Sequence, residues 1–258
     1  MPNPHGTHIW YELMTTDPDA AGRFYADVVG WAAAPFGGEG APGYTIFSTA
    51  ETGVGGMMTL PAGAAEGGLR PGWLGYVGVD DVDAAVAAIT AGGGTVHMPA
   101  NDLPGVGRMA LVTDPQGVLF YVMRGASESD SRAFDPRAIG HCAWHELATT
   151  DQAAALIFYG EQFGWRQSGS MPMGDLGDYV FLDHGGAPIG AVMTRQEAGP
   201  PPMWSYYFRV PDIDAAAARI AAGGGNVLHG PQEVPGGDHI VVAADPQGVM
   251  FHLVGAKA

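Results

Sequence analysis

Apolar and polar residues alternate along several short runs of the chain, and the first such run is followed by helical spacing. Alternation over residues 8–14 predicts a strand. Thr16 or Asp17 then caps a helix that Pro18 opens, and its apolar positions keep a helical spacing until Gly30. A strand followed directly by an amphipathic helix is therefore the first element pair.

The same strand-helix order returns before the middle of the chain. Residues 74–79 predict a strand, Asp81 caps the next helix, and the glycines at 92–94 stop it. The runs "YTIFSTA" and "GVGGMMTL" add strands to the first unit, and "RMALVTDPQGVLFYVM" adds a hairpin to the second. The pattern predicts two successive βαβββ modules.

The second half of the chain repeats the first. The segment Trp10–Trp31 aligns without gaps on Trp144–Trp165, with 12 of 22 positions identical. Trp73–Val96 aligns on Trp204–Val227 with 14 of 24 identical, and "DPQGV" recurs intact. Two long ungapped matches in the same order predict a duplicated domain.

A polar, turn-rich stretch separates the two copies. The sequence "RGASESDSRAFDPRAIG" is typical of a linker between compact units. We therefore predict a first domain over residues 1–125, a linker over 126–140 and a second domain over 141–258. The predicted class is α+β, a tandem duplication with two βαβββ modules in each domain.

The order of these motifs resembles a known superfamily. The strand before "FY…GW", the "VDDVDAA…AGGGTV" helix and the hairpin around "DPQG" are together similar to the vicinal oxygen chelate proteins, which include glyoxalases, bleomycin-resistance proteins and extradiol dioxygenases. The resemblance covers nearly the whole chain and is strongest to two-domain bacterial proteins related to lactoylglutathione lyase. It implies that paired modules curl into an eight-stranded sheet with helices outside, and that enzymes of the family hold a divalent metal on the first and last strands of each module.

The positions that would hold this metal carry few ligand side chains. Carried over from the family, they fall at Trp10, Leu74, Tyr121, Trp144, Ser205 and His252, with Met57 or Met58 and Ala191 or Val192 on the last strands of the first modules. A divalent site usually takes three His or carboxylate ligands. We expect no metal at these positions, although an unorthodox set of Glu146, His239 and His252 in domain two stays open.

Two glutamates occupy equivalent places in the repeat. Alternate strand residues share a face, so Glu12 should point the same way as Trp10, and Glu146 the same way as Trp144. A partly desolvated carboxylate is suited to proton abstraction. The alternative interpretation is a structural carboxylate, hydrogen-bonded to a neighbouring strand or paired with an arginine.

Polar residues of the "DPQG" hairpins differ between the halves. The alignment equates Arg108 with His239 and Tyr121 with His252, and we expect each hairpin to place its two residues on one face. In domain two the predicted set of base, acid and orienter is Glu146, His239 and His252. In domain one an anion or carbonyl clamp is predicted, because arginine cannot act as a base; its members are Glu12, Arg108 and Tyr121.

Aromatic residues also recur in both halves. Either they pack the core, or some of them form a stacking wall for an aromatic or conjugated ligand. The predicted substrate-binding residues are Arg108, Tyr121, Trp10, Trp144, Tyr76, Tyr207 and Ser205.

Composition narrows the choice of partners. The formal net charge of -16 and a pI near 4.6 disfavour nucleic acids and anionic membranes. A single cysteine, Cys142, excludes an internal disulfide, and the opening residues lack a secretory signal, so a cytoplasmic protein is expected. No run approaches the roughly 20 apolar residues of a membrane span. A monomer or a homodimer is expected.

Three functions compete. The leading hypothesis is an enzyme that acts on a small oxygenated metabolite by proton transfer, of lyase or isomerase type, without the family metal site. The alternative is a non-catalytic protein that binds or sequesters an aromatic metabolite or antibiotic. An iron-dependent dioxygenase or hydroxylase ranks third, because it needs two histidines and a carboxylate in the family positions.

Overall fold

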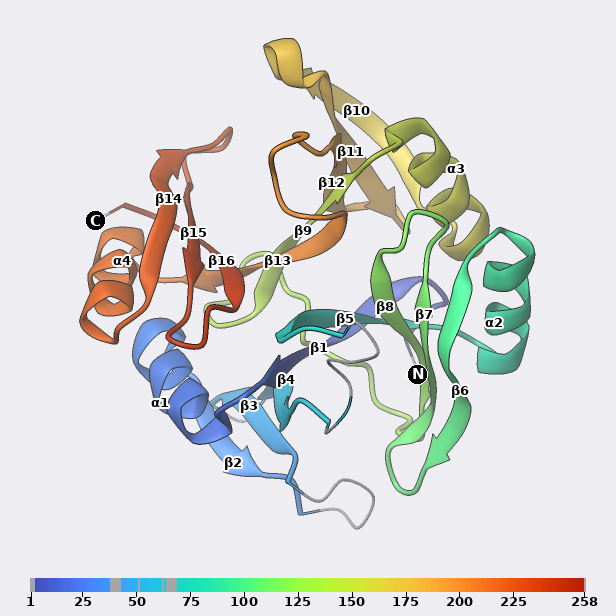
Figure 1. Ribbon diagram of the computed structural model, residues 1–258, viewed down its shortest axis with the longest axis horizontal. Helices are drawn as coiled ribbons and strands as arrows, with labels where there is room; N and C mark the ends of the chain where they lie inside the picture. The colour runs from blue at the N-terminus through green and yellow to red at the C-terminus, as the bar shows by residue number, and fades with distance from the viewer. Residues whose placement is uncertain (1–2, 38–42, 51, 62, 64–68, 258) are drawn as a thin grey trace. The chain divides into compact units, whose positions relative to one another are not determined.

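The computed structural model describes residues 3–37, 43–50, 52–61, 63 and 69–257. Within them the chain forms two eight-stranded sheets and four α-helices (Figure 1). The strand orders are β2-β3-β4-β1-β5-β8-β7-β6 and β10-β11-β12-β9-β13-β16-β15-β14. The second order repeats the first with every strand number raised by eight, which confirms the predicted α+β fold with tandem domains.

The first half contains two βαβββ modules. The first consists of β1 (Thr7–Thr15), α1 (Pro18–Val29), β2 (Ala32–Pro35), β3 (Thr45–Thr49) and β4 (Thr52–Thr59). The second consists of β5 (Gly72–Gly78), α2 (Val82–Ala91), β6 (Thr95–Leu103), β7 (Gly107–Thr113) and β8 (Leu119–Gly125).

The second half repeats both modules. Its first module consists of β9 (Cys142–Thr149), α3 (Gln152–Phe163), β10 (Arg166–Pro172), the 3-10 turn η1 (Gly174–Leu176), β11 (Asp178–His184) and β12 (Ala187–Thr194). Its second module consists of β13 (Met203–Val210), α4 (Ile213–Ala222), β14 (Asn226–Glu233), β15 (His239–Ala244) and β16 (Met250–Gly255). None of the helices in the described residues is long and apolar enough to cross a membrane.

The helix boundaries follow the predicted signals. Asp17 caps α1, where its side chain accepts a hydrogen bond from the Ala20 amide at 3.0 Å. Asp81 caps α2 in the same way through the Ala84 amide at 3.0 Å. Gly30 ends α1 in the left-handed region, at a φ of 89° that favours glycine.

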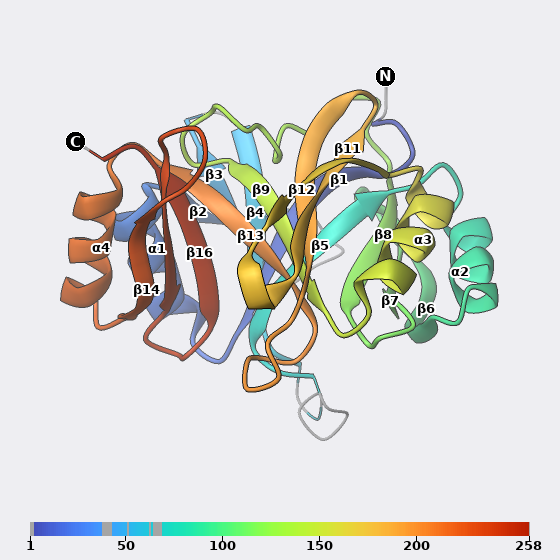
Figure 2. The ribbon, with the colours of Figure 1, turned by 90° about the horizontal axis from the view of Figure 1, so that it is seen from above.

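The chain divides into two compact units that each combine modules from both halves. Unit 1 comprises Met1–Ile9, Gly75–Ser131 and His145–Ser205, and unit 2 comprises Trp10–Leu74, Arg132–Trp144 and Tyr206–Ala258. Within unit 1, α2 and α3 lie side by side, and within unit 2, α1 and α4 do (Figures 1 and 2). The domain boundaries set from the linker stay a prediction.

A buried polar chain in unit 2 joins a first-module helix to the "DPQG" turn of the other half. The Trp73 indole donates to the Tyr25 hydroxyl at 3.1 Å, and that hydroxyl donates to Asp245 at 3.2 Å. Asp245 also accepts from the amides of Gln247 and Val249 at 2.9 Å each. Burial raises the pKa of Asp245 above its usual value.

Unit 1 contains the same chain of hydrogen bonds. Trp204 donates to the Tyr159 hydroxyl at 3.0 Å, and Tyr159 donates to Asp114 at 3.1 Å. Asp114 accepts from the amides of Gln116 and Val118. The "DPQG" aspartates are therefore structural: each one closes a hairpin and anchors a helix.

Candidate functional site

Each first module has one face covered by its helix and an opposite face, which we call its open face. On β3, Phe47 contacts the Tyr25 ring of α1 at 5.9 Å between centroids. The next residue pair in register, Ile46 and Gly56, must project from the opposite face because strand side chains alternate. Glu12 is paired with Gly56 and therefore lies on the open face.

In the first half, the open face carries an indole and a phenol beside this glutamate. The Trp10 indole nitrogen donates a hydrogen bond to the Tyr44 hydroxyl at 2.9 Å. A Cβ added at Gly56 would overlap the Tyr44 ring, so the ring lies directly on the strand at the register of Glu12. Glu12 is only 3% exposed.

In the second half, the equivalent glutamate is more accessible. Glu146 on β9 is paired with Ala191 on β12 and is half-buried. The Tyr179 hydroxyl donates to its carboxylate at 2.8 Å. This charge-assisted hydrogen bond orients the carboxylate and stabilises its ionised form.

The two tyrosines were missed in the sequence prediction. Tyr44 stands just before β3 in the run "YTIF", and Tyr179 stands near the start of β11 in the run "YVFL". Aligning those runs on their shared Tyr would have equated the two residues. The signal was present, but it depends on a short match with a different offset.

The second module of the first half presents two stacked phenols. Tyr76 on β5 is paired in register with Tyr121 on β8, and their ring centroids lie 4.2 Å apart at an interplanar angle of 15°. Both residues are at most 5% exposed. Two of the predicted ligand-binding residues thus pack face to face against each other, and their binding role stays a prediction.

The equivalent pair in the second half is a phenol and an imidazole. Tyr207 on β13 is paired with His252 on β16, with ring centroids 4.9 Å apart. Burial lowers the pKa of His252 to about 4, so the imidazole is neutral at pH 7. A neutral imidazole is suited to a hydrogen bond and is a poor source of protons at that pH.

Trp144 packs beside this pair. The buried cluster of Ala143, Tyr207 and Val254 is flanked by Trp144 and Ile240. Ser205 is 7% exposed and shares the Tyr207 face of β13, because the two residues alternate along the strand. Within unit 2, Trp144 therefore packs against the cluster that contains Tyr207, and the use of these rings as a stacking wall for a ligand stays a prediction.

The prediction that Arg108 and Tyr121 share a face is wrong. Leu111 is the partner of Tyr121, and β7 runs without a bulge from residue 107 to 113, so Arg108 projects from the other face. There its guanidinium pairs with Asp83 of α2 at 2.8 Å and with Asp102 at 3.2 Å. These aspartates raise the pKa of Arg108 further. Arg108 is a surface ion-pair residue on the helix side.

The same error applies to His239 and His252. His252 is paired with Val242, and β15 shows no register shift, so His239 shares the opposite face with Val241 and Ala243. These two residues are fully buried on the side of α4. Neither a catalytic triad nor a metal set can contain both histidines. Convergence of Glu146 with His252, or of Glu12 with Tyr121, stays a prediction, since each pair is divided between the two units.

Comparison with family models gives one match. The model described as "Glyoxalase/Bleomycin resistance protein/Dioxygenase superfamily" matches residues 8–122 and 138–253. The chain belongs to this superfamily. The resemblance drawn from the repeated motifs is thereby confirmed.

Two curated relatives match almost from end to end. "Putative glyoxylase CFP32" of Mycobacterium tuberculosis is 36% identical over 253 residues, which cover 96% of this chain and 94% of that protein. "Anthracycline biosynthesis protein DnrV" of Streptomyces peucetius is 31% identical over 261 residues, covering 96% and 93%.

Solved structures of superfamily members share the fold. The Mn(II)-bound glyoxalase from Novosphingobium aromaticivorans is similar with a TM-score of 0.64 at 19% identity, over 97% of this chain and 81% of that one. An extradiol ring-cleaving dioxygenase from B. fuscum gives 0.67 at 16% identity, over 100% and 74%. At such identities the likeness concerns architecture alone.

The side chains at the superfamily's metal positions do not fit a divalent ion. They are indole, phenol, hydroxyl and aliphatic groups, with His252 as the single strong ligand. The described part of the chain also contains no group of three or more His, Cys, Asp or Glu residues placed to hold a metal. We therefore derive no chemical step through a metal in this member of the superfamily.

Four histidines that the sequence left unassigned lie together in unit 1. His8 stacks on His145 with ring centroids 3.6 Å apart, His8 also interacts electrostatically with His184, and His184 interacts with His5. Burial, then His145 and His184, lowers the pKa of His8 well below its usual value. Burial lowers the pKa of His145 to about 3. Both rings are neutral core residues at pH 7.

The equivalent positions in unit 2 contain no histidine. In the repeat alignment, Cys142 of unit 2 is equivalent to His8 of unit 1, and Tyr11 of unit 2 is equivalent to His145 of unit 1. These two side chains share a hydrogen bond, and burial raises the pKa of Cys142 to about 12. The thiol is therefore protonated and unsuited to nucleophilic attack.

Proposed function

We propose that the protein is an enzyme that acts on a small oxygenated organic molecule by proton transfer, and that Glu146 is its base. The observation that carries this proposal is the half-buried Glu146 carboxylate held by the Tyr179 hydroxyl at 2.8 Å on an open face. Glu12 has the same place in the repeat but is 3% exposed beneath Tyr44, so the second half is the better candidate.

The proposed step moves one proton. Glu146 takes it from a carbon next to a carbonyl group, and the electron pair of the broken C–H bond moves onto the carbonyl oxygen as an enolate. Return of the proton to a neighbouring carbon gives an isomer, and loss of a β-substituent gives a lyase product. Tyr179 keeps Glu146 ionised before the transfer because its hydrogen bond is stronger to the charged form.

Flat aromatic ketones are the substrate class that we propose first, on the name of one relative. The name of DnrV assigns that relative to anthracycline biosynthesis, which agrees with a multi-ring aromatic substrate. The name of CFP32 points instead to glyoxylase activity, and both classes contain a carbonyl next to an acidic C–H.

The test is a turnover screen with matched glutamate variants. Hydroxylated anthraquinone ketones and α-ketoaldehyde thiol adducts are incubated with wild type, Glu146→Gln and Glu12→Gln, and products are followed by mass spectrometry. We expect Glu146→Gln to lower turnover by about 10²- to 10⁴-fold, as for loss of a general base, and Glu12→Gln to retain most of it. Turnover that survives in Glu146→Gln contradicts the proposal.

A binding protein is the second candidate, supported by the stacked Tyr76 and Tyr121 rings. Such a protein would quench its tryptophan fluorescence on adding an anthraquinone and leave the compound chemically unchanged. Quenching without any product in wild type would favour this function over catalysis. Metal analysis of protein purified without added metal completes the screen, since stoichiometric iron would favour an oxygenase.

A further inference from the structure

The residue directly opposite the open-face glutamate differs between the two first modules. Gly56 is paired with Glu12, and Ala191 is paired with Glu146. The strands on the other side confirm the equivalence, because Gly56 is paired with Ile46 and Ala191 with Phe181, each two residues after the module tyrosine. One methyl group therefore separates the two sites at this register.

In the first half, a tyrosine ring fills the space left by the missing methyl group. The ring of Tyr44 lies where a Cβ of residue 56 would be, and its hydroxyl accepts the Trp10 indole hydrogen. Since Glu12 projects beside Gly56, the phenol covers the carboxylate, which is 3% exposed. The outcome is a glutamate closed off from substrate.

The second half has no room for the same arrangement. The Cβ of Ala191 is fully buried at the place that the Tyr44 ring takes in the first half. The Tyr179 ring must therefore stand off the strand, and from there its hydroxyl donates to Glu146 at 2.8 Å. Glu146 remains half-buried and within reach of a ligand.

A second glycine of β4, Gly53, also lies close to an aromatic ring in the first half and is replaced in the second half. A Cβ at Gly53 would lie 3.2 Å from the Trp10 ring, so the indole also lies close to the strand in the first half. The register places Pro188, which has a Cβ, at the equivalent position of the second half. Gly53 and Gly56 of β4 thus let the Trp10 and Tyr44 rings lie close to the strand that is paired with Glu12.

We infer that Gly56 and Ala191 are positioning residues that set access to the glutamate, closing the first-half site and keeping the second-half site open. The inference deepens the proposed function, since only an accessible carboxylate can take a proton from a substrate. It also predicts that a single methyl group interconverts the two states. Gly56→Ala would displace Tyr44 and uncover Glu12, and Ala191→Gly would let Tyr179 settle over Glu146.

Carboxylate labelling measures this access without any substrate. Native protein is treated with a water-soluble carbodiimide and glycine ethyl ester, and the labelled glutamates are quantified by peptide mass spectrometry. In wild type we expect Glu146 to be labelled several-fold faster than Glu12. Gly56→Ala should raise labelling of Glu12 several-fold, and Ala191→Gly should lower labelling of Glu146 several-fold.

Controls separate access from a general loosening of the fold. Tyr44→Ala removes the cover without touching Gly56, so it should raise labelling of Glu12 at least as much as Gly56→Ala does. Labelling of the exposed Asp19, in the first turn of α1, should be the same in all variants that fold normally. Equal labelling of Glu12 and Glu146 in wild type, or no change in Gly56→Ala and Ala191→Gly, would overturn the inference.

The inference and the proposed function fail in different ways. If labelling changes as expected but Glu146→Gln keeps full turnover, the positioning is correct and the assignment of the base is wrong. If labelling does not change but Glu146→Gln is inactive, the base is correct and the positioning is wrong. Where turnover is found, Ala191→Gly should lower kcat and leave circular dichroism and thermal unfolding close to wild type.

Discussion

The two first modules, β1–β4 and β9–β12, share a scaffold but differ on their open faces. Both helices start at an aspartate cap and end at a left-handed glycine, Asp17 with Gly30 and Asp151 with Gly164. The tryptophan that follows each helix donates to a glycine carbonyl in its own unit. The open faces, by contrast, hold a covered Glu12 and an accessible Glu146.

The difference shows which residues a duplicated fold must retain. Caps, left-handed glycines and buried hydrogen-bond chains hold the elements in place, so changing them costs stability in either copy. Residues of the open face contribute much less to the stability of the fold. One copy can therefore diverge by a methyl group at residue 191, and the two copies come to present different chemistry.

The largest effect on stability should come from the stacked histidines of unit 1. His8 and His145 have folded-state pKa values below the usual 6.5, so the unfolded chain binds more protons as pH falls. Stability is therefore fully present above about pH 6.5 and is lost as pH falls from there toward 3. At pH 4.5 the expected loss from His145 is about 2 to 3 kcal/mol, and His8 adds a loss in the same direction.

Copying the other half removes this dependence. The double variant His8→Cys, His145→Tyr installs the Cys142 and Tyr11 pair of unit 2 in unit 1. Urea unfolding of wild type and variant between pH 4.5 and 8 should show a much flatter curve for the variant. Identical slopes would contradict the prediction; His252, Asp114 and Asp245 titrate in both proteins, so their contributions cancel in the difference.

A smaller effect should be shared by both halves. Tyr25→Phe and Tyr159→Phe each remove a hydroxyl that accepts from a buried indole and donates to a buried aspartate. Each substitution should lower the free energy of unfolding by about 1 to 3 kcal/mol, because the groups left behind lose their partner. Urea unfolding at pH 7 measures both, and markedly unequal losses would show that the scaffold is less symmetric than its hydrogen bonds.

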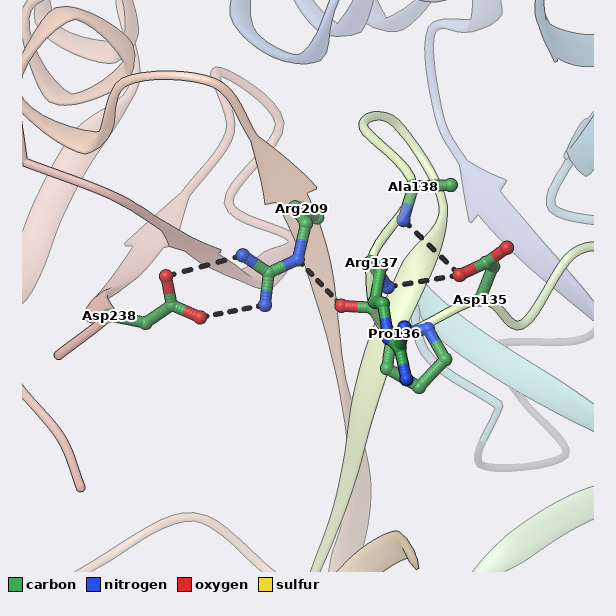
Figure 3. A network of polar contacts seen from close by, with 6 residues as sticks. All are labelled: Asp135, Pro136, Arg137, Ala138, Arg209 and Asp238. Atoms are coloured by element: carbon green, nitrogen blue, oxygen red, sulfur yellow. Dashed lines mark hydrogen bonds and ion pairs between the residues drawn. The ribbon is translucent and has the colours of Figure 1, made fainter. Parts of the chain in front are cut away.

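The smallest effect concerns an ion pair that only the second half has. Arg209 donates to the Asp238 carboxylate at 2.7 and 3.2 Å (Figure 3). It also donates to the Pro136 carbonyl at 2.7 Å, and this hydrogen bond fixes the turn in which Asp135 accepts from the Arg137 amide. The repeat places Gly78 at the equivalent position. Arg209→Ala should cost about 1 kcal/mol, less at high salt.

A double-mutant cycle with Asp238→Ala isolates this interaction. Urea unfolding of the four proteins at low and high ionic strength should give a coupling energy that shrinks as salt is added. A cycle with no coupling at low salt would mean that Arg209 acts only through the Pro136 carbonyl.

The fold was predictable because its signals are local and occur twice. Asp17, Asp81 and Gly30 act within one turn of their helices, so spacing alone located these boundaries. The repeated "DPQG" hairpin was equally clear. How the modules group into compact units was not predictable, because the contacts between Tyr25 and Asp245 join residues 220 positions apart.

The site was predictable only in part. Strand alternation correctly placed Glu12 with Trp10. It failed for Arg108 and His239, since an error of one residue in hairpin register moves a side chain to the other face. The covering of Glu12 depends on the space at Gly56, and no periodicity in the sequence reports that space.

The most direct test of the central claim is exchange of a substrate hydrogen with solvent. A ketone found in the turnover screen is incubated in deuterium oxide with wild type, Glu146→Gln or Glu12→Gln, and deuterium uptake at the carbon next to the carbonyl is followed by mass spectrometry. The account predicts rapid uptake with wild type and Glu12→Gln and none above background with Glu146→Gln. Uptake that persists in Glu146→Gln and is lost in Glu12→Gln would contradict it.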